Sequence, residues 1–360
     1  MATTPHTRAS FVIPGDLATP SGGYGYDRRI LARLPAYGID IAHVALPGSF
    51  PNPTPADLVE TEAILDALAA HQVLLIDGLA YGAMGFDLIN RIRQPIVALC
   101  HHPLALEAGL SEARRAQLQL SERNALTRAR HVIVTSPMTA RILNEDFGVA
   151  ADHIMVAEPG TDKAQRVKGS GANPGASLHL LAVGAIVPRK GYDVLIKALA
   201  PLTDRAWSLC IVGAARDADL LAALESQIAE ASLGDRIRLL GARSEAELDE
   251  IYATSDIFVM PSLFEGYGMV LGEAMARGLP IVCTTGGAAA ETAPNAAALK
   301  VPPGDAAAFG TAVARLLDDA MLRATMADAA WQAGMMLPSW DDAAKRIAAV
   351  LKAVARGIGS

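Results

Sequence analysis

The stretch PSLFEGYGMVLGEAMARGLP, residues 261–280, decides the fold of this 360-residue chain. Strand-like runs flank it, IFVM at 257–260 and IVC at 281–283, so the order is strand, glycine-bearing turn, helix, strand. Parallel sheets built from such units bind ligands at the carboxyl ends of their strands, where helix N-termini attract anions and glycines let the backbone approach a ligand. The stretch therefore predicts a ligand site in an open α/β sheet.

Two carboxylates, Glu265 in the turn and Glu273 in the predicted helix, are the charged acceptors of this stretch. A carboxylate can accept two hydroxyl hydrogen bonds, which is how the vicinal diol of a ribose or a hexose is held. Amides for phosphate and carboxylates for diols together suit a nucleotide sugar. The alternative is that Glu273 pairs with Arg277 four residues further on and that Glu265 is an ordinary turn residue.

Length and composition favour a cytoplasmic α/β protein of two domains. A chain of 360 residues is long for one core, and its apolar runs are interrupted before they reach the length of a membrane span. The polar N-terminus, residues 1–10, does not resemble a signal peptide. A net charge of −7 argues against a general nucleic-acid binder. Three cysteines in or at the ends of strand-like runs are expected to be buried free thiols in a reducing compartment, namely Cys100, Cys210 and Cys283.

Basic residues gather in one segment of this acidic chain, between residues 91 and 141. Such a segment can face anionic lipid or an anionic acceptor, and the first of these would make the protein peripheral at the inner membrane face. The alternative is a solvated helix face. The arginines are Arg91, Arg93, Arg114, Arg115, Arg123, Arg128, Arg130 and Arg141, against the acidic Glu107, Glu112 and Glu122.

The first half of the chain alternates strands and helices. A strand at 11–13 leads through Gly22 and Gly23 into a helix, an arrangement that makes a place for phosphate. The dinucleotide fingerprint GxGxxG is missing from this turn, so no nicotinamide cofactor is indicated. Further strands are expected at 39–45, 73–76, 96–99, 131–134 and 153–156, with helices near 56–70, 84–91, 111–130 and 137–147. The alternation predicts a parallel, doubly wound sheet.

Two adjacent histidines, His101 and His102, follow the strand at 96–99. A carboxyl strand end is where binding groups usually lie, and adjacent side chains on extended backbone point to opposite sides. We therefore expect one of the two imidazoles to enter the site. The alternative is one buried, hydrogen-bonded histidine and one exposed. No third ligand stands at a recognisable spacing, so no metal site is expected here.

The second half opens with a strand at 178–183, followed by Gly184 and the adjacent cations Arg189 and Lys190 just before a helix. Cations at the positive end of a helix repel it unless an anion fills the site, so the turn is an expected anion trap. The alternative is a solvent-exposed basic turn. Further on, the acidic pair Asp217 and Asp219 at a helix start either complements the helix dipole or signals a metal carried with a diphosphate.

A linker is expected between the halves, because residues 163–177 have the glycine and proline content of one. This places an N-terminal Rossmann-like domain at 1–165 and a C-terminal one at 176–338. A last helix follows the break at Pro338, within 340–360.

With these features in order, the second half resembles the C-terminal domain of retaining glycosyltransferases of family 4, the glycosyl transferases group 1. The matching features are Gly184 with PRKG at 188–191, Leu240 with Gly241, Tyr252 with Ser255 and Asp256, PS at 261–262, Glu265 with Glu273, and GLPIV at 278–282. The first half adds Gly22 with Gly23, the histidine at a strand end, and PGTD at 159–162. The family has the GT-B fold, in which two Rossmann-like domains face each other across a cleft and the last helix crosses back to the first domain.

The resemblance implies a role for each candidate residue. It implies that Arg189, Lys190 and the amides of Gly22 and Gly23 hold the donor diphosphate, and that Glu273 holds the ribose diol. It further implies that Glu265 holds hydroxyls of the donor sugar and that His101 or His102 contacts the sugar near the reacting carbon. The remaining donor contacts come from Gly184, Gly241 and the turn of Gly266, Tyr267, Gly268, Met269 and Val270.

The chemistry that the family resemblance implies is transfer of a hexosyl unit from an NDP-sugar, with UDP-sugars foremost, to a hydroxyl acceptor such as a lipid or glycan. Cations and a helix N-terminus can stabilise the leaving diphosphate without a metal, and the NDP-sugar is a co-substrate rather than a cofactor. Retention is ascribed to attack on the face from which the phosphate departs, so no protein nucleophile is assigned. Ala185 departs from the pattern, because many members carry arginine directly after this glycine.

Other functions share the same architecture and stay open at the level of sequence. These are a nucleotide-sugar epimerase, a phosphorylase, and a non-catalytic partner subunit of a transferase. A degenerate subunit should lose the charged residues, whereas Arg189, Lys190, Glu265 and Glu273 are all present.

Overall fold

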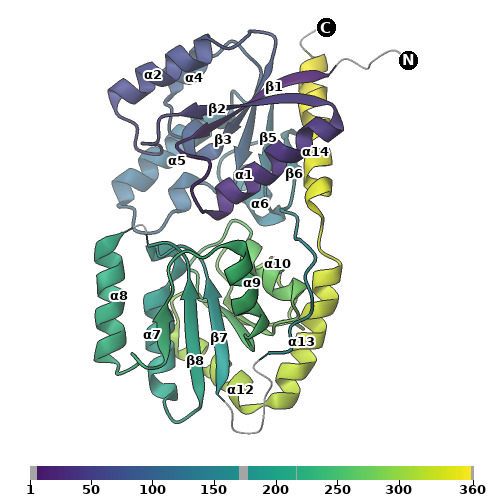
Figure 1. Ribbon diagram of the computed structural model, residues 1–360. Coiled ribbons are helices and arrows are strands. Elements are labelled where there is room, and N and C mark those ends of the chain that lie inside the picture. Colours follow the sequence, from purple (N-terminus) through teal and green to yellow (C-terminus); the bar gives the residue numbers. More distant parts are fainter. Residues whose placement is uncertain (1–5, 170–176, 216, 358–360) are drawn as a thin grey trace. The chain divides into compact units, whose positions relative to one another are not determined.

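The computed structural model describes residues 6–169, 177–215 and 217–357, and the chain divides into two compact units. The first unit runs to Gly160 and takes in the segment from Pro338 onward, and the second unit is Thr161–Leu337. Residues 170–176 of the predicted linker and 358–360 of the last predicted helix lie outside the described residues. Each unit is an α/β fold in its own right (Figure 1).

The first unit holds a six-stranded sheet in the order β2-β1-β3-β4-β5-β6, in which every pair is parallel. Its strands are β1 (Thr7–Pro14), β2 (Ile39–Leu46), β3 (Val73–Asp77), β4 (Ile96–Cys100), β5 (His131–Val134) and β6 (Ile154–Val156). Its helices are α1 (Gly22–Arg33), α2 (Pro55–Asp66), α3 (Gly78–Tyr81), α4 (Phe86–Arg91), α5 (Glu112–Leu126), α6 (Pro137–Glu145) and α14 (Trp340–Arg356). Short 3-10 turns are η1 (Leu34–Tyr37), η2 (Leu104–Leu106) and η3 (Ala151–His153).

The second unit holds another parallel six-stranded sheet, in the order β12-β11-β10-β7-β8-β9. Its strands are β7 (Leu178–Val183), β8 (Trp207–Val212), β9 (Ile237–Leu239), β10 (Ile257–Met260), β11 (Ile281–Thr284) and β12 (Ala298–Val301). Its helices are α7 (Tyr192–Leu199), α8 (Ala218–Glu230), α9 (Glu245–Ala253), α10 (Met269–Ala276), α11 (Ala289–Thr292), α12 (Ala306–Asp318) and α13 (Ala320–Met335), with 3-10 turns η4 (Pro188–Lys190) and η5 (Ala200–Leu202).

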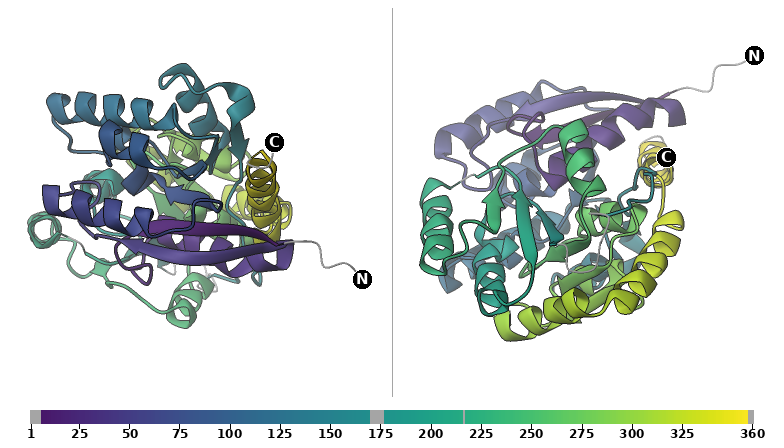
Figure 2. Two further views of the ribbon diagram at one scale, coloured as in Figure 1. Left: turned by 90° about the horizontal axis from the view of Figure 1, so that it is seen from above. Right: turned by 60° about the horizontal axis from the view of Figure 1, so that its bottom comes forward.

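The central strands of both sheets are buried along their whole length, as in β3, β4, β10 and β11. Strands of this kind need helices on both faces of the sheet, because an apolar residue on either side must leave water. Figure 2 shows the helices that flank the sheets. This confirms the predicted architecture of two Rossmann-like domains.

The last helix, α14, packs on the sheet of the first unit, as predicted (Figure 1, yellow). A capping box between Ser339 and Asp342 starts it directly after Pro338. Trp340, Ile347 and Leu351 are buried on its inner side. The chain therefore returns to the first unit after completing the second.

Both strand orders reverse direction at a defined point. In the second sheet, β7 lies between β8 and β10, so the chain builds outward from β7 on one side and from β10 on the other. In the first sheet, the same holds for β1, which lies between β2 and β3. Ligands of open α/β sheets bind at the carboxyl ends of the strands that meet at such a point. In the second unit these ends lead into the cationic turn after β7 and the 261–280 stretch after β10.

Some local expectations differ from the structure. The helix expected near 84–91 begins at Phe86, because Gly85 takes the left-handed region at its N-cap, and the short α3 precedes it. The strand expected from His153 begins at Ile154 after η3. Cys100 and Cys283 are buried as predicted, whereas Cys210 is only half-buried. Among the described residues, no helix combines the length and the apolar character required to cross a bilayer.

One buried carboxylate fixes the loop that follows β4. Glu122 of α5 accepts hydrogen bonds from the amides of Leu104 (2.9 Å) and Ala105 (3.2 Å), and burial raises its pKa to about 7 although these two bonds oppose the rise. Glu122→Gln places an amide NH₂ against one of these N–H donors. We expect it to lower the free energy of unfolding by about 1–3 kcal/mol, measured by denaturant titration at pH 8. Glu60→Gln, at an exposed site of α2, is the control and should change little.

Candidate functional site

The turn after β10 is shaped by close backbone contacts with the turn after β11. The amide of Glu265 donates to the carbonyl oxygen of Gly286 (3.2 Å), and the amide of Ala288 donates to the carbonyl oxygen of Glu265 (2.8 Å). Gly287 has φ +63°, and a Cβ there would lie 2.3 Å from the Glu265 carbonyl oxygen. Only glycine fits this position, so the two turns hold the Glu265 backbone in place.

Glu265 lies between the two cations of the turn after β7. Its Oε1 is 2.7 Å from Lys190 Nζ and its Oε2 is 3.2 Å from Arg189 Nη1. Arg189 Nη1 also donates to the carbonyl oxygen of Phe264 (2.6 Å), and the Leu263 amide donates to the carbonyl oxygen of Arg189 (2.7 Å). The carboxyl ends of β7 and β10 are thus joined by one buried ion-pair cluster.

The two cations of this cluster favour the ionised form of Glu265. Burial alone would raise the pKa of Glu265, but Lys190 and Arg189 outweigh it and lower the pKa to about 2. The Arg189 and Lys190 side chains are only 16% and 13% exposed, which excludes the alternative of a solvent-exposed basic turn. The expected anion trap therefore already contains one anion of the protein itself.

Glycines bring backbone close to this cluster. A Cβ at Gly184 would lie 2.9 Å from Lys190 Cε, and the Gly184 carbonyl oxygen accepts a hydrogen bond from Tyr192 Oη (2.8 Å). Gly241 follows β9, the strand beyond β8, and its carbonyl oxygen accepts a hydrogen bond from the amide of Gly213 (2.9 Å). Both candidate glycines lie at the carboxyl edge of the second sheet, as expected from their positions after strands.

The segment of Gly266, Tyr267, Gly268, Met269 and Val270 turns the chain from β10 into α10. Gly268 is the N-cap of α10 with φ +86°, a conformation that favours glycine. Thr292 Oγ1 donates to the carbonyl oxygen of Tyr267 (2.6 Å), which pins the turn from α11. The turn ends at the N-terminus of α10, and the first N–H groups of a helix lack the i−4 acceptor that later residues have.

Glu273 lies one turn into α10 and is oriented by a neighbouring helix. Tyr252 of α9 is fully buried, and its Oη donates to Glu273 Oε2 (3.1 Å). Arg277 stacks on the Tyr252 ring (4.3 Å to the centroid), and it donates to the carboxylate of Asp249 and to the main-chain oxygen of Glu273. Tyr252, which the sequence offered as a matching feature without a role, is therefore a positioning residue for Glu273.

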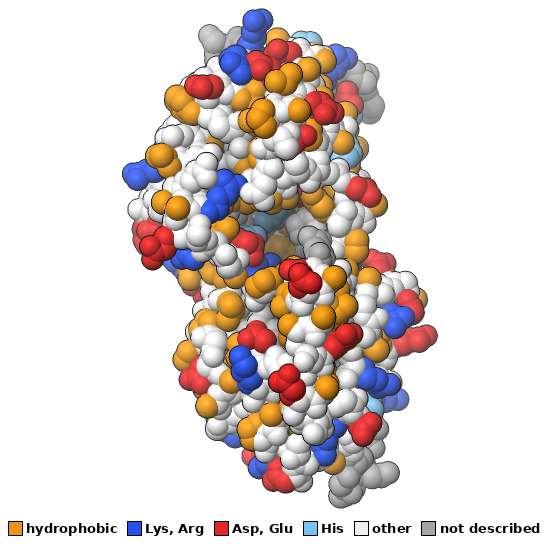
Figure 3. Space-filling view, turned by 90° about the vertical axis from the view of Figure 1, so that its left-hand side faces the viewer, with side chains coloured by type: hydrophobic (Ala, Val, Ile, Leu, Met, Phe, Trp, Pro, Cys, Tyr) orange, Lys and Arg blue, Asp and Glu red, His pale blue; other side chains and the backbone are white. Residues whose placement is uncertain are grey.

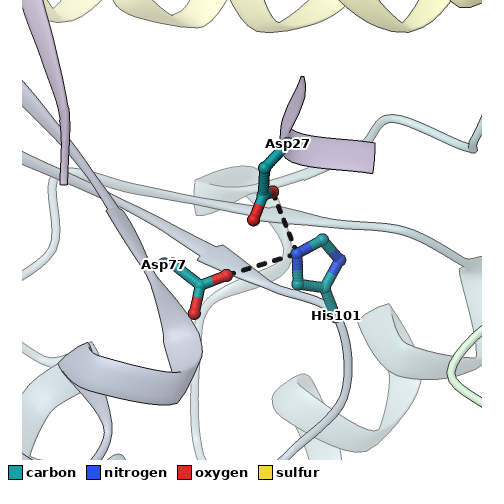
Figure 4. Close-up of side chains that lie close together, drawn as sticks. All are labelled: Asp27, Asp77 and His101. Atoms are coloured by element: carbon teal, nitrogen blue, oxygen red, sulfur yellow. Dashed lines mark hydrogen bonds and ion pairs between the residues drawn. The ribbon is translucent and has the colours of Figure 1, made fainter. Parts of the chain in front are cut away.

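A second cluster lies in the first unit, where Figure 4 shows Asp27 and Asp77 on the same side of the His101 ring. His101 Nε2 is 3.1 Å from Asp27 Oδ1 and 3.3 Å from Asp77 Oδ2. Asp27 comes from α1, and Asp77 ends β3 and caps α3 through the Leu79 amide (2.8 Å). A Cβ at Gly23 would lie 3.5 Å from His101 Cδ2, so the glycine turn of α1 adjoins the same ring.

The two adjacent histidines diverge as expected. His101 joins the aspartates, whereas His102 Nε2 lies 3.0 Å from Glu107 Oε2 within its own loop. Asp27 and Asp77 were missed at the level of sequence. Asp77 directly follows the apolar run 73–76, and a polar residue at the end of a strand indicates a binding site. Asp27 could be found only from its spacing of four residues after Gly23, which places the two on one face of a helix.

Gly23 thus adjoins His101 in the first unit, with Gly22 directly before it at the start of α1. Arg189, Lys190, Glu265 and Glu273 lie at one edge of the second sheet. Among the described residues, Asp27, Asp77 and His101 form a group of metal-ligand type whose atoms lie within 4.8 Å of one another. The alternative metal pair of the sequence, Asp217 and Asp219, instead starts α8, because Asp217 accepts hydrogen bonds from the amides of Asp219 and Leu220. This supports the capping interpretation of that pair.

The basic segment of the first unit is partly engaged by the protein itself. Arg91 pairs with Glu62 (2.6 Å), and Arg114 donates to Pro51 and Asn52 of a neighbouring loop. On the face in Figure 3, acidic and basic side chains are interspersed. That face carries no large patch of one sign.

Two family models match the chain. Residues 50–165 match the model described as Glycosyltransferase Family 4, and residues 165–332 match the model described as Glycosyl transferases group 1. The matched regions meet at residue 165 and together span most of the chain.

Individual relatives and solved structures agree with these models. The chain is 29% identical to the D-inositol 3-phosphate glycosyltransferase of Nocardia farcinica, in an alignment that covers 66% of this chain and 57% of the relative. It is 31% identical to the mannosylfructose-phosphate synthase of Agrobacterium fabrum, in an alignment that covers 43% of this chain and 38% of the relative. The chain thus spans less than two thirds of these curated relatives.

The solved structures support the same fold over nearly the whole chain. The sucrose-phosphate synthase of Thermosynechococcus elongatus superposes with a TM-score of 0.84 at 22% identity, covering 98% of this chain and all of the other. Anabaena Alr3699/HepE in complex with UDP-glucose gives a TM-score of 0.73 at 18% identity over 96% and 99%. The fold is therefore GT-B, and the chain belongs to glycosyltransferase family 4, the glycosyl transferases group 1.

Proposed function

We propose that this protein transfers a hexosyl unit from an NDP-sugar, foremost a UDP-sugar, to a hydroxyl acceptor with retention of configuration and without a metal. The observation that carries the proposal is the cluster of Lys190, Arg189 and Glu265 at the reversal point of the second sheet. Two preplaced cations beside a helix N-terminus can take up the negative charge that develops on a departing diphosphate.

In this proposal residues 176–338 bind the donor, and residues 1–165 with the helix within 340–360 bind the acceptor. Glu273 holds the ribose diol, Glu265 holds hydroxyls of the donor sugar, and Gly22 and Gly23 offer amides to phosphate. Gly184, Gly241 and the turn of Gly266, Tyr267, Gly268, Met269 and Val270 complete the donor contacts. His101 contacts the sugar, because His102 is directed to Glu107 instead.

The names of the relatives guide the choice of acceptor. They include an inositol-phosphate glycosyltransferase and a mannosylfructose-phosphate synthase, so phosphorylated sugars and polyols belong in the acceptor panel beside lipids and glycans. If the acceptor is a lipid, we expect the protein to bind at the surface of an anionic membrane. Its binding to anionic vesicles should then weaken as the salt concentration rises.

The test is a donor screen followed by turnover. UDP-, GDP- and ADP-sugars are screened for thermal stabilisation, since a ligand that binds the folded state raises the melting temperature. The stabilising donor is then incubated with the acceptor panel, and NDP release and the glycoside are measured without metal and with EDTA.

Each other function has its own outcome in this test. An epimerase would convert the donor sugar without an acceptor, a phosphorylase would require inorganic phosphate, and a partner subunit would bind the donor without turnover. Failure of every NDP-sugar to stabilise the protein would contradict the proposal.

The proposed role of Glu273 makes a separate prediction about Tyr252. Tyr252→Phe removes the hydrogen bond to Glu273 Oε2 and leaves the buried ring in place. Because one such bond contributes about 1 kcal/mol, we expect calorimetry to show roughly fivefold weaker binding of the nucleoside diphosphate. Tyr37→Phe, which removes a comparable bond to Asp341 in the first unit, is the matched control. Equal affinity of the Tyr252 variant would remove Tyr252 from the donor site.

A further inference from the structure

Tyr26 is a buried residue of the first unit that the proposed function does not use. It lies on α1 with 0% of its surface exposed, and its hydroxyl donates to the carbonyl oxygen of Ala157 (2.9 Å). Its ring meets two other rings edge-on, that of His101 at 5.3 Å between centroids and that of Trp340 at 5.7 Å. Edge-to-face contacts of this length are attractive. Tyr26 therefore lies between the histidine of the site and the first residue of α14.

The polar contacts of the His101 ring leave its tilt open. Nε2 contacts the carboxylates of Asp27 and Asp77, and both contacts act on one atom of the ring. The main chain is fixed separately, because Thr135 Oγ1 donates to the His101 carbonyl oxygen (3.1 Å). The last torsion of a histidine side chain is intrinsically soft, so the neighbours that pack against the ring determine its orientation. Tyr26 is an aromatic neighbour that packs against it.

Trp340 is itself fixed beside Tyr26 by its surroundings. It is only 5% exposed, and the Arg29 guanidinium lies 5.7 Å from the centroid of its ring. A Cβ at Gly160 would lie 2.1 Å from the Trp340 main-chain nitrogen and 2.5 Å from the Ser339 carbonyl carbon. The two backbones thus cross in direct contact, and only glycine fits at this point. Trp340 cannot shift without displacing the crossing.

This crossing is where the chain leaves and re-enters the first unit. The unit runs to Gly160 and resumes at Pro338. Tyr26 contacts the chain before the exit through Ala157 and after the re-entry through Trp340. One side chain therefore links both segments to the histidine at the end of β4.

We propose that Tyr26 is a positioning residue that sets the orientation of the His101 ring, and that Trp340 holds Tyr26 in place. The start of α14 is then part of the support of the site. Neither residue is assigned a contact with a ligand. The effect on turnover rests on the proposed function, whereas the orientation of the ring rests on the contacts within the first unit alone.

A residue that only fills the core would behave differently when it is replaced. Its loss lowers the stability of the protein but leaves the molecules that remain folded as active as wild type. A positioning residue changes the rate of the folded protein, because a displacement of about 1 Å at a reacting group can cost about 100-fold. Turnover and the melting temperature are therefore measured side by side.

Tyr26→Leu should lower kcat for sugar transfer by roughly 10- to 100-fold in the folded protein, with a smaller change in KM. Tyr26→Phe keeps the ring and loses only the bond to Ala157, so it should restore most of the turnover. The matched control is Tyr81→Leu, because Tyr81 is also buried in the first unit and its hydroxyl donates to the Ala125 carbonyl oxygen (2.7 Å). It should lower the melting temperature and leave kcat unchanged. Wild-type kcat in Tyr26→Leu, or an equal loss in Tyr81→Leu, would overturn the inference.

The ring itself is observed by NMR of ¹³C,¹⁵N-histidine in the full chain at constant pH, with His101 assigned through His101→Asn. Trp340→Phe keeps an aromatic residue in place, so it tests the support even if Tyr26→Leu does not fold. We expect Trp340→Phe to shift the ring signals of His101 more than those of the neighbouring His102. Trp207→Phe, the same change at a buried tryptophan of the second unit, is the matched control and should leave the His101 signals in place.

These measurements separate the positioning role from the proposed function. If the His101 signals shift in Trp340→Phe but no NDP-sugar is turned over, the proposed function fails while the positioning stands. If an NDP-sugar is turned over but the His101 signals stay unmoved in Trp340→Phe, the positioning is overturned while the proposed function stands.

Discussion

Lys190→Met is expected to lower kcat for sugar transfer by about 100- to 1000-fold, the usual cost of removing one preplaced donor to a developing charge. Lys190 Nζ lies 2.7 Å from Glu265 Oε1 at the carboxyl end of β7, and methionine keeps most of the aliphatic side chain while it removes the charge. The leaving diphosphate gains charge as its bond to the sugar breaks. The loss should therefore fall on kcat and kcat/KM more than on donor affinity.

The measurement is steady-state turnover with the donor identified by the thermal screen. Lys197→Met, on the exposed side of the next helix with a side chain 62% exposed, is the matched control and should retain activity. Because Lys190 also contacts Glu265, the melting temperature of the variant is measured in parallel. Turnover within threefold of wild type, in a folded variant, would remove Lys190 from the leaving-group site.

The sequence predicted the candidate residues of the second unit better than it predicted their mutual contacts. Their order along strand, turn and helix locates Arg189, Lys190 and Glu265 at one sheet edge, because parallel strands end on the same side. The sequence pattern predicts that the cations bind phosphate and that Glu265 binds the sugar, and it predicts no contact between them. The direct contact between them depends on the backbone bonds between the 263–265 turn and its neighbours, which join residues far apart in the chain.

In the first unit, the sequence predicted the histidines of the cluster but not the aspartates. The adjacent histidines were found because they follow a strand, and their divergence follows from extended backbone. Asp27 and Asp77 come from two other elements, and only the strand order β2-β1-β3-β4 brings α1 and the end of β3 to the end of β4. The sequence alone does not distinguish a buried charged residue of a helix, such as Asp27, from a solvent-exposed one. Its role becomes visible only with its partners.

Glu265→Gln is expected to destabilise the ligand-free protein and to enlarge its response to a diphosphate. The carboxylate neutralises two cations whose side chains are at most 16% exposed, and breaking such a buried pair costs about 3–5 kcal/mol. Glutamine keeps the shape and one acceptor but leaves two positive charges unbalanced. The melting temperature should therefore fall by several degrees, whereas Glu225→Gln, at an exposed site of α8, should not move it.

The pH dependence identifies the cause of this loss. The pKa of Glu265 is lowered from 4.5 to about 2 by Lys190 and Arg189 against the effect of burial. A carboxyl group whose pKa falls on folding stabilises the native state above the unfolded value and loses that contribution as the pH falls through the folded one. The difference in stability between wild type and variant should thus be full above pH 4.5 and shrink toward pH 2.

Adding a diphosphate to wild type and to Glu265→Gln tests whether Glu265 is also part of the donor site. Inorganic pyrophosphate or the nucleoside diphosphate brings the negative charge that the variant lacks, so it should raise the melting temperature of Glu265→Gln more than that of wild type. Turnover should be lost in the same variant, since in the proposed function Glu265 holds hydroxyls of the donor sugar. A diphosphate that stabilises both proteins equally would mean that Lys190 and Arg189 do not contact it.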